Sequence, residues 1–285
     1  MANQNKSIYL EVKDHSVSKE VFTLFYNKEL DLLETSPQPD EDKLPEYYKS
    51  EDYISHTNAK RNLFEKLYHG VRFLALRRKL QLIESFELDS KTLLDVGCGT
   101  GDFLSLAENR GWDIVGVEPN KKARAIAQEK CTGDIKNIDA LKKLEKNSYS
   151  VITLWHVLEH LPNLTEHVEL FKSLLKPNGV LVIAVPNYKS YDANYYKNFW
   201  AAYDVPRHLW HFSKTSIQRL FEKEDLRIKK IKPLIFDAFY VSILSEKYKN
   251  SQLQMLLGAM IGLWSNLNAV FTKEYSSLIY VLQAK

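Results

Sequence analysis

The chain has 285 residues, which by the scaling of buried surface with size is enough for a complete enzyme core. Hydrophobic residues make up 45% and charged residues 26%, ordinary values for a globular protein that exclude a disordered chain, a collagen-like repeat and a membrane bundle. The 39 basic and 36 acidic side chains give a net charge of +3, too little to indicate a nucleic-acid or membrane-surface partner.

Cysteine content and hydropathy indicate where the protein works. Cys98 and Cys131 lack the spacing of a disulfide framework or a zinc ligand set, which indicates a reducing compartment. The first residues contain no basic segment followed by an apolar stretch, so we expect no secretory signal and a cytoplasmic protein. The longest non-polar run, 255–264, is about half the length of a membrane-spanning helix, so no transmembrane segment is expected.

The N-terminal region is predicted to be an appendage rather than a domain. From Ser7 to about Asp52 the chain is polar and interrupted by three prolines, which predicts a short hairpin followed by an extended arm. Residues 58–86 then carry apolar side chains at helical spacing, which predicts an amphipathic lead helix into the core.

Short apolar runs alternate with helical stretches through the rest of the chain. Strands are predicted at 92–96, 114–117, 150–155 and 180–185, with helices at 102–110, 121–130 and 164–175 between them. Strands that alternate with helices indicate a parallel sheet covered on both faces. Two more strands, at 226–235 and 277–282, flank an insertion.

The most informative motif is segment 93–101, where a hydrophobic strand leads into three glycines and then a helix near Asp102. Glycines allow the backbone to approach a ligand closely. Their GxGxG spacing differs from the GxGxxG of dinucleotide-binding proteins, in which a pyrophosphate lies at the helix N-terminus. Asp102 at that place would repel a pyrophosphate but tolerate a sulfonium or ammonium cation.

Acidic residues are expected near the ends of the next two strands. Glu118 ends the second strand, where its two oxygens can accept hydrogen bonds from both hydroxyls of a ribose. Segment 133–135 lies where a third strand is expected to end, which would place Asp134 near an adenine amino group. A nucleoside without phosphates fits all three motifs. A turn that serves packing, or that holds a nucleotide, would explain the glycines alone.

At these residues the sequence resembles the class I S-adenosylmethionine-dependent methyltransferases, from about Lys91 through Pro186. Segment 154–162 looks most like the ubiquinone- and menaquinone-type subgroup. The resemblance implies an α/β, Rossmann-like sheet of seven mostly parallel strands, with S-adenosylmethionine as cofactor and S-adenosylhomocysteine as product. It also implies one methyltransferase domain, 88–285, with an insertion at 237–274, preceded by an arm, lid and lead helix at 1–87.

The resemblance further implies which residues surround the cofactor. The glycine-rich loop would wrap the methionine part, and a tyrosine and a histidine of the N-terminal arm would close over it, unless that arm only packs on the core. The expected cofactor-binding residues are Asp95, Gly97, Cys98, Gly99, Gly101, Glu118, Pro119, Asp134, Ile135, Trp155, His156, Tyr53 and His56.

Methyl transfer is an in-line displacement at a sulfonium carbon, so the enzyme must align the acceptor and remove its proton. Histidine suits that role for an oxygen or carbon acceptor. The catalytic candidates are His156, His208 and His211, whereas His160 is expected mainly to support the active-site loop. Segment 156–160 also matches a zinc-protease pattern, but that pattern belongs on a helix and this segment follows a strand, so we expect no metal.

Nine aromatic residues between 188 and 212, together with a cation and two histidines, follow the fifth strand. Ligands of open α/β sheets bind at the carboxyl ends of strands. This segment is therefore predicted to line the substrate pocket, although packing of the rings on the core is the alternative. The substrate-binding candidates are Tyr195, Trp200, Arg207, His208 and Trp210.

The sequence thus predicts methylation of a small molecule, with oxygen as the leading acceptor atom and nitrogen or carbon open. One alternative is an RNA or protein methyltransferase, and the basic cluster at 72–79 is the only sequence feature that supports it. The other is a non-catalytic S-adenosylmethionine-binding module. The more common role of such a cluster is a solvated helix face, so no nucleic-acid partner is expected. The apolar stripe at 251–272 is predicted to pack in the core, with a homodimer interface or a lipid-facing lid as alternatives.

Overall fold

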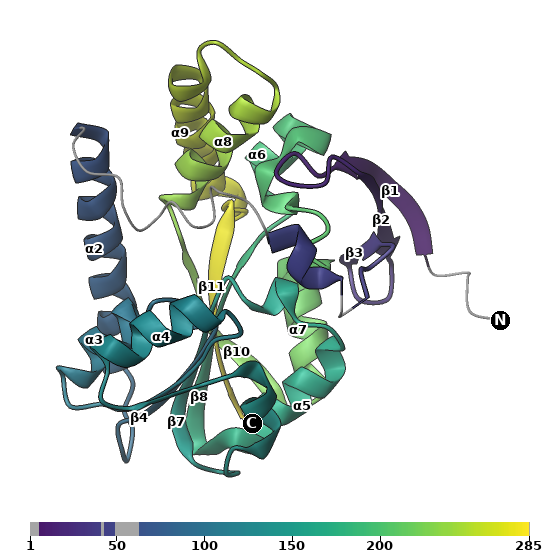
Figure 1. Cartoon of the computed structure of the whole chain (residues 1–285). Coiled ribbons are helices and arrows are strands. Elements are labelled where there is room, and N and C mark those ends of the chain that lie inside the picture. Colours follow the sequence, from purple (N-terminus) through teal and green to yellow (C-terminus); the bar gives the residue numbers. More distant parts are fainter. Residues whose placement is uncertain (1–5, 41–42, 49–62, 285) are drawn as a thin grey trace.

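A computed structural model describes residues 6–40, 43–48 and 63–284 (Figure 1). Its central element is a seven-stranded sheet in the order β10-β11-β8-β7-β4-β5-β6. The neighbours from β8 to β6 pair in parallel, whereas β11 pairs antiparallel with both β8 and β10. The strands are β4 (Thr92–Val96), β5 (Asp113–Val117), β6 (Asp134–Lys136), β7 (Tyr149–Trp155), β8 (Leu175–Pro186), β10 (Leu226–Pro233) and β11 (Ser277–Ala284). The predicted fold class is confirmed.

Helices cover both faces of this sheet because successive strand residues point to opposite sides. Leu93 packs with residues of α2 (Leu63–Glu84), α3 (Asp102–Glu108) and α4 (Lys121–Lys130). Leu94 packs with residues of α5 (Leu164–Leu174) and α7 (Lys214–Glu222). Two hydrophobic cores therefore hold the strand ends, and the loops that follow them, in fixed positions.

The lead helix packs over only part of its length. Leu80, Leu82 and Ile83 near the end of α2 are buried against the sheet. One turn or more earlier, Phe73 is 48% and Leu74 is 40% exposed. The apolar period of the sequence therefore did not mark one continuous buried face, and Figure 1 shows α2 extending beyond the sheet.

The N-terminal region forms more than the predicted hairpin. β1 (Lys6–Lys13), β2 (Val21–Asn27) and β3 (Leu32–Ser36) form an antiparallel sheet that a fourth strand, β9 (Trp210–His211), completes. A short 3₁₀ helix, η1 (Leu44–Tyr48), follows. Because β9 lies far along the chain from β3, this second sheet ties the N-terminal region to the segment after β8.

A third hydrophobic cluster fills the space beneath this second sheet. Val12, Phe22 and Leu24 of its strands pack against side chains of α6 (Tyr191–Tyr196) and of two 3₁₀ turns, η5 (Lys197–Phe199) and η6 (Ala201–Tyr203). Most of the aromatic side chains predicted to line a substrate pocket lie in this cluster or in the core beside it. Those with at most 4% exposure are Tyr188, Tyr196, Trp200, Tyr203 and Phe212.

The insertion consists of α8 (Asp237–Tyr248) and α9 (Gln254–Thr272), which pack side by side (Figure 1). Small residues of α9 face α8, and a Cβ on Gly258 would lie 2.5 Å from Cα of Ile243. The apolar stripe therefore lies outside, not in the core as predicted. Its side chains that are half exposed or more are Leu253, Leu256, Met260, Leu263, Trp264, Leu267 and Phe271. The homodimer and lipid-facing alternatives stay predictions.

Of the helices that the structure describes, only α9 is long and apolar enough to cross a membrane, and 22% of its apolar window is buried. The unbroken run in the sequence stops at Ser265, so it understated the apolar length of this helix. Ser265 points inward, where its hydroxyl donates to Asp192 (2.7 Å). One face of α9 thus packs against α6 and α8 and is not available to lipid.

Candidate active site

The loop between β4 and α3 is built around glycines in left-handed backbone conformations. Gly97 has φ 71° and Gly101 has φ 75°. The amides of Gly97 and Cys98 both donate to the carbonyl of Val117 (2.7 and 3.1 Å), which fastens the loop to the end of β5. A Cβ on Gly97 would lie 2.4 Å from Cγ2 of Val157, whereas one on Gly99 would meet nothing within 4 Å. The loop is therefore closely packed behind and open at Gly99.

Replacing Gly97 with alanine is expected to destabilise the protein more than the same change at Gly111. Both positions have positive φ, which costs about 1–2 kcal/mol for a residue with a Cβ, but Gly111 faces open space. Thermal denaturation compares the two variants. A second change, Val157→Ala, should recover the part of the loss that comes from the clash. Equal losses at both glycines would mean that Val157 does not restrict the loop.

Glu118 lies at the end of β5, next to this loop, and is 8% exposed. The amide of Gly99 donates to its Oε2 (2.9 Å) and the amide of Asn120 donates to its Oε1 (2.8 Å). Burial raises the pKa of Glu118, and these two hydrogen bonds counter that effect. A carboxylate has about four acceptor positions, so each oxygen can still accept a ribose hydroxyl.

Asp95 and Cys98 line the loop from the buried side. Asp95 accepts a hydrogen bond from the Thr153 hydroxyl (2.6 Å), and burial raises its pKa to about 7. Burial also raises the pKa of the Cys98 thiol well above its usual value, so this cysteine stays a protonated packing residue.

Asp102 does not act as predicted. Its carboxylate accepts hydrogen bonds from Arg72 and from Lys130, the latter at 2.7 Å. Both cations lower its pKa against burial, which raises it. Since two cations already neutralise Asp102, its charge gives little selection between a pyrophosphate and a cationic ligand.

Asp134 and Ile135 are corrections to the predicted adenine contact. β6 begins at Asp134, which pairs with Val115 in the middle of β5, so its 72% exposed side chain lies two residues before the strand end rather than after it. Ile135 is buried, and its amide donates to Gln128. From the sequence we predicted the end of the third strand at 133–135, whereas β6 begins at Asp134.

The residues at the correct end of β6 are Asn137 and Asp139. The amide of Glu118 donates to the carbonyl of Lys136 (2.9 Å), so the chain leaves β6 beside Glu118. Asn137 then caps the 3₁₀ helix η3 (Ile138–Lys143). Asparagine is a common N-cap residue, so Asn137 was the one signal in the sequence that could have marked the end of β6.

Trp155 and His156 end β7 and begin the loop after it. The Trp155 ring lies edge-on to Phe103 (5.6 Å between centroids) and beneath the amino group of Lys79 (4.4 Å). His156 has φ 59°, with Nε2 3.0 Å from Asp237 and Nδ1 3.4 Å from Glu159.

Two carboxylates keep His156 charged. Burial lowers its pKa, but Asp237 and Glu159 outweigh burial and raise it to about 10. An imidazolium cannot accept a proton, so the two carboxylates disfavour His156 as the base, and its catalytic role stays a prediction. Whether His156 or Trp155 contacts the cofactor stays a prediction.

His211 is also a structural residue. It is 4% exposed and lies opposite Leu33 in the second sheet. Thr35 donates its hydroxyl proton to the carbonyl of His208 (2.6 Å), so the same oxygen accepts from Nε2 of His211 (3.1 Å). Burial holds the pKa of His211 well below its usual value. Its burial and its bond to Thr35 fit a structural role, and its catalytic role stays a prediction.

Arg207, a predicted substrate-binding residue, is 4% exposed and fully engaged within the protein. Its guanidinium donates to Asp14 (2.9 Å), to Asp204 (2.6 Å) and to the carbonyl of Tyr47 (3.0 Å). Asp14 lies between β1 and β2, so Arg207 fastens the second sheet to the segment after β8. It holds the fold together and has no donor left for a substrate.

The three aromatic substrate candidates also have other roles. Trp200 is 1% exposed and donates Nε1 to Asp192 (2.7 Å), and Trp210 donates Nε1 to the carbonyl of Leu161 (2.8 Å). Tyr195 is 47% exposed on α6 and stacks on Tyr191. The packing alternative therefore fits Trp200 and Trp210 but not the exposed Tyr195, and the substrate-binding roles of all three stay predictions.

Two predicted residues cannot be placed, and one lies beside the loop. Tyr53 and His56 lie outside the described residues, so their lid role stays a prediction. Pro119 is exposed after β5, and its carbonyl accepts a hydrogen bond from Arg124 (3.1 Å).

His208 is a predicted catalytic histidine whose Nε2 has no hydrogen-bond partner among the described residues. It is 9% exposed, and its Nδ1 lies 2.8 Å from the carbonyl oxygen of Ala202. Its ring meets that of His160 edge-on, with 4.5 Å between centroids. Glu159, beside His160, is wholly buried. These three side chains form the cluster that we call the Glu–His–His cluster.

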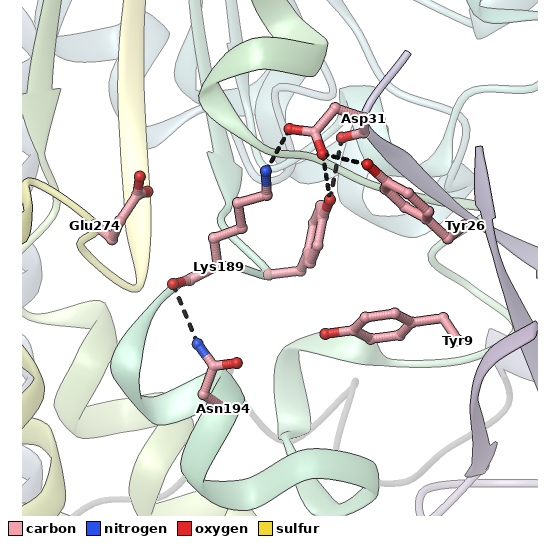
Figure 2. Close-up of a pocket in the computed structure, with 7 residues that line it drawn as sticks. Tyr9, Tyr26, Asp31, Lys189, Asn194 and Glu274 are labelled. Atoms are coloured by element: carbon pink, nitrogen blue, oxygen red, sulfur yellow. Dashed lines mark hydrogen bonds and ion pairs between the residues drawn. The ribbon is translucent and has the colours of Figure 1, made fainter. Parts of the chain in front are cut away.

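A separate cavity of about 520 Å³ lies between the second sheet and the segment after β8 (Figure 2). At its edge Asp31 accepts hydrogen bonds from Tyr26, Tyr188 and Lys189. None of its described lining residues belongs to the glycine loop. The sequence could not indicate this cavity, because the N-terminal sheet that forms one wall had not been predicted. The lining residues are Tyr9, Tyr26, Asp31, Tyr188, Lys189, Asn194 and Glu274.

Comparison with known proteins decides the family. Residues 64–231, more than half of the chain, match a family model described as a methyltransferase domain. The chain belongs to the methyltransferase family. The predicted recognition, enzyme class and S-adenosylmethionine dependence of this methyltransferase are thereby confirmed.

Curated relatives of this methyltransferase are ubiquinone biosynthesis O-methyltransferases. That of Paraburkholderia xenovorans is 32% identical over 113 residues, which are 36% of this chain and 49% of the relative. That of Rickettsia prowazekii is 24% identical over 198 residues, 65% of this chain and 78% of the relative. The chain thus spans about half the length of the first of these relatives.

Solved structures share the fold of this methyltransferase. Magnesium protoporphyrin IX methyltransferase from Synechocystis PCC 6803, with bound S-adenosylhomocysteine, has a TM-score of 0.57 at 14% identity over 86% of this chain and all of that one. A methyltransferase from Archaeoglobus fulgidus has a TM-score of 0.51 at 22% identity over 77% of this chain and 97% of that one.

The residues at the glycine loop fit the cofactor. The open space beside Gly99 leaves room for a ligand against the backbone, and Glu118 retains acceptor positions for two hydroxyls. When bound, the cofactor supplies an electrophilic methyl group. Glu118 would hold the ribose, and the bond from Gly97 to Val117 keeps the loop in place.

Proposed function

We propose that this methyltransferase transfers a methyl group to an oxygen atom of a small molecule. The observation that carries the proposal is the Glu–His–His cluster, which begins two residues after Val157, the side chain packed behind the glycine loop. A hydroxyl acceptor must lose its proton, and a buried carboxylate with two imidazoles can take that proton or hold the oxygen. The names of the curated O-methyltransferase relatives support the same acceptor atom.

The basic cluster of α2 gives little support to an RNA acceptor, because its described cations already have partners. Arg72 pairs with Asp102, and the guanidinium of Arg77 lies 4.3 Å from the centre of the Phe73 ring. The guanidinium of Arg78 lies 5.5 Å from the ring of Phe236. Phosphates would have to displace these contacts, so a small acceptor is the better proposal.

The proposed function is tested with S-adenosylmethionine labelled in its methyl group. The protein is incubated with separate pools of phenols, aliphatic hydroxy compounds, carboxylic acids and amines, and with total RNA and unfolded protein. We expect label in a hydroxy compound, with an equal amount of S-adenosylhomocysteine formed. Label in RNA or protein would contradict the proposal. Cofactor binding without transfer to any pool would favour a non-catalytic binding module.

A further inference from the structure

Glu159 is a buried carboxylate with a long contact to a described cation, since its Oε1 lies 3.4 Å from Nδ1 of His156. It lies in the 3₁₀ helix η4 (Leu158–His160), directly after β7, and is 0% exposed. Neither of its carboxylate oxygens accepts a hydrogen bond from a described residue. A buried charge without hydrogen bonds is costly, so each such group calls for a partner.

Two histidines next to Glu159 each have Nδ1 beside a backbone carbonyl. Nδ1 of His160 lies 2.9 Å from the carbonyl oxygen of Arg207, and Nδ1 of His208 lies 2.8 Å from that of Ala202. A carbonyl oxygen only accepts hydrogen bonds, so in both rings Nδ1 carries the proton. In a neutral imidazole Nε2 then has a free lone pair. Histidines that bind metals are commonly oriented by such a bond to a carbonyl.

The three side chains converge. One ligand atom from each of Glu159, His160 and His208 lies within 4.8 Å of the others. Ligands at 2.0–2.2 Å from one tetrahedral ion lie about 3.4 Å apart, so closure by about 1 Å would suffice. Two imidazoles and a carboxylate that accepts no described hydrogen bond therefore converge, and a cation between them would make this arrangement more favourable.

We propose that Glu159, His160 and His208 bind a divalent transition-metal ion of the zinc class. Two imidazoles and one carboxylate are a recurrent ligand set for zinc and related ions, whereas magnesium and calcium prefer oxygen ligands. Three protein ligands leave a coordination position for a water molecule or a substrate oxygen. This inference goes beyond the proposed function, because it does not depend on which acceptor is methylated.

The ligand set differs from the pattern that the sequence displays. The zinc-protease pattern would use His156 and His160, and on that comparison we expected no metal. His156 instead directs Nε2 to Asp237 at 3.0 Å, so it is already occupied. His208, which comes from the segment after β8, takes its place in the cluster. Only the fold brings His208 within reach of Glu159.

The test measures metal binding directly. The full chain without an affinity tag is stripped of metal with a chelator, dialysed, and titrated with Zn²⁺, and separately with Co²⁺ as a spectroscopic probe. We expect one ion for each chain and visible Co²⁺ bands typical of nitrogen and oxygen ligands. Removal of one ligand, in Glu159→Gln or His208→Gln, is expected to weaken binding at least about 100-fold.

Two matched variants identify the ligands. His167→Gln removes a histidine of α5 outside the cluster and should leave Zn²⁺ binding unchanged. His156→Gln should also retain the ion. Loss of binding in His156→Gln but not in His208→Gln would overturn the ligand set in favour of the sequence pattern. Binding that all variants retain would show a surface site and would also overturn it.

The unaltered protein gives a result that does not depend on whether the variants fold. If it binds no Zn²⁺ or Co²⁺ while S-adenosylhomocysteine still binds, the His156 imidazolium rather than a metal balances Glu159 and the inference is wrong. Metal binding without methyl transfer would leave the inference intact and contradict only the proposed function. The two proposals therefore fail separately.

Discussion

Replacing Glu118 with alanine is expected to abolish S-adenosylhomocysteine binding at concentrations that saturate the unaltered protein. A hydrogen bond to a charged group contributes about 1.5–3 kcal/mol. Loss of both ribose contacts therefore predicts about 3–6 kcal/mol, or roughly a 10²–10⁴-fold weaker affinity. Isothermal titration with S-adenosylhomocysteine measures the change directly and needs no knowledge of the acceptor.

Two further variants separate the ribose contact from the folding of the loop. Glu118→Gln retains the size of the side chain but offers one acceptor oxygen where two amides now donate, so an intermediate affinity is expected. Glu129→Ala removes an exposed acid from α4 and should bind normally. Circular dichroism establishes that each variant is folded. Unchanged affinity in folded Glu118→Ala would contradict the assignment of this loop as the cofactor site.

The main sheet could be predicted from the sequence because its signals are local. The bounds predicted for β4 and α4 match the structure, since a buried apolar run identifies the first and Asn120 caps the second, with its side chain accepting from the amides of Lys122 and Ala123. The second sheet has no such signal. Its strand β9 has two residues and pairs Trp210 with Glu34, far back in the sequence. Non-local pairing of this kind has no periodic pattern.

The candidate site was predictable where one residue type is required by the backbone. Gly97 has positive φ and a side chain directly behind it, and Glu118 ends a strand next to that loop. Asp134 was misplaced because β6 runs from this residue to Lys136, so its side chain lies within the strand rather than in the loop after it. The burial of His211 and Trp200 was not predictable, because polar and aromatic side chains look the same in sequence whether they line a pocket or a core.

The same ambiguity applies to the Glu–His–His cluster and to α9. In the sequence, His156 and His160 form a pair four residues apart. In the fold, the ring next to His160 is that of His208. The apolar stripe of α9 had the composition of a core helix. Gly258 and Gly262 allow its backbone so close to α8 that its large side chains are left on the outside. Whether an apolar segment is buried depends on the element that packs against it, not on its own hydrophobic pattern.

Replacing Arg207 with alanine is expected to destabilise the fold rather than to impair substrate binding alone. Removing one partner of a buried ion pair costs about 3–5 kcal/mol, because the remaining charge is left buried without compensation. Here two carboxylates, Asp14 and Asp204, would lose their cation. Denaturant unfolding gives the loss, and Arg227→Ala on the exposed edge strand β10 is the control, with a change of about 0.5 kcal/mol or less.

The pH dependence of stability identifies the interaction that is lost. Burial alone would raise the pKa of Asp14, but hydrogen bonds from Arg207 and from the amides of Ser18 and Ser16 lower it to about 2 in the folded state, below its ordinary value of 3.8. A depressed carboxyl pKa contributes stability that is fully present above pH 4 and is lost as the pH falls from about 4 to 2. In Arg207→Ala much of this acid-sensitive contribution should be absent.

A second substitution then distinguishes the structural role of Arg207 from a role in binding substrate. Asp14→Asn in the Arg207→Ala background removes one of the stranded charges, so it should recover part of the lost stability, whereas the same change alone should destabilise. If Arg207→Ala unfolds like the unaltered protein while the Michaelis constant for an acceptor rises, Arg207 contacts substrate and the packing assigned to it here is wrong. Because Asp14 belongs to the second sheet and Arg207 to the segment after β8, we expect instead that the N-terminal strands are the first to become sensitive to proteolysis in the variant.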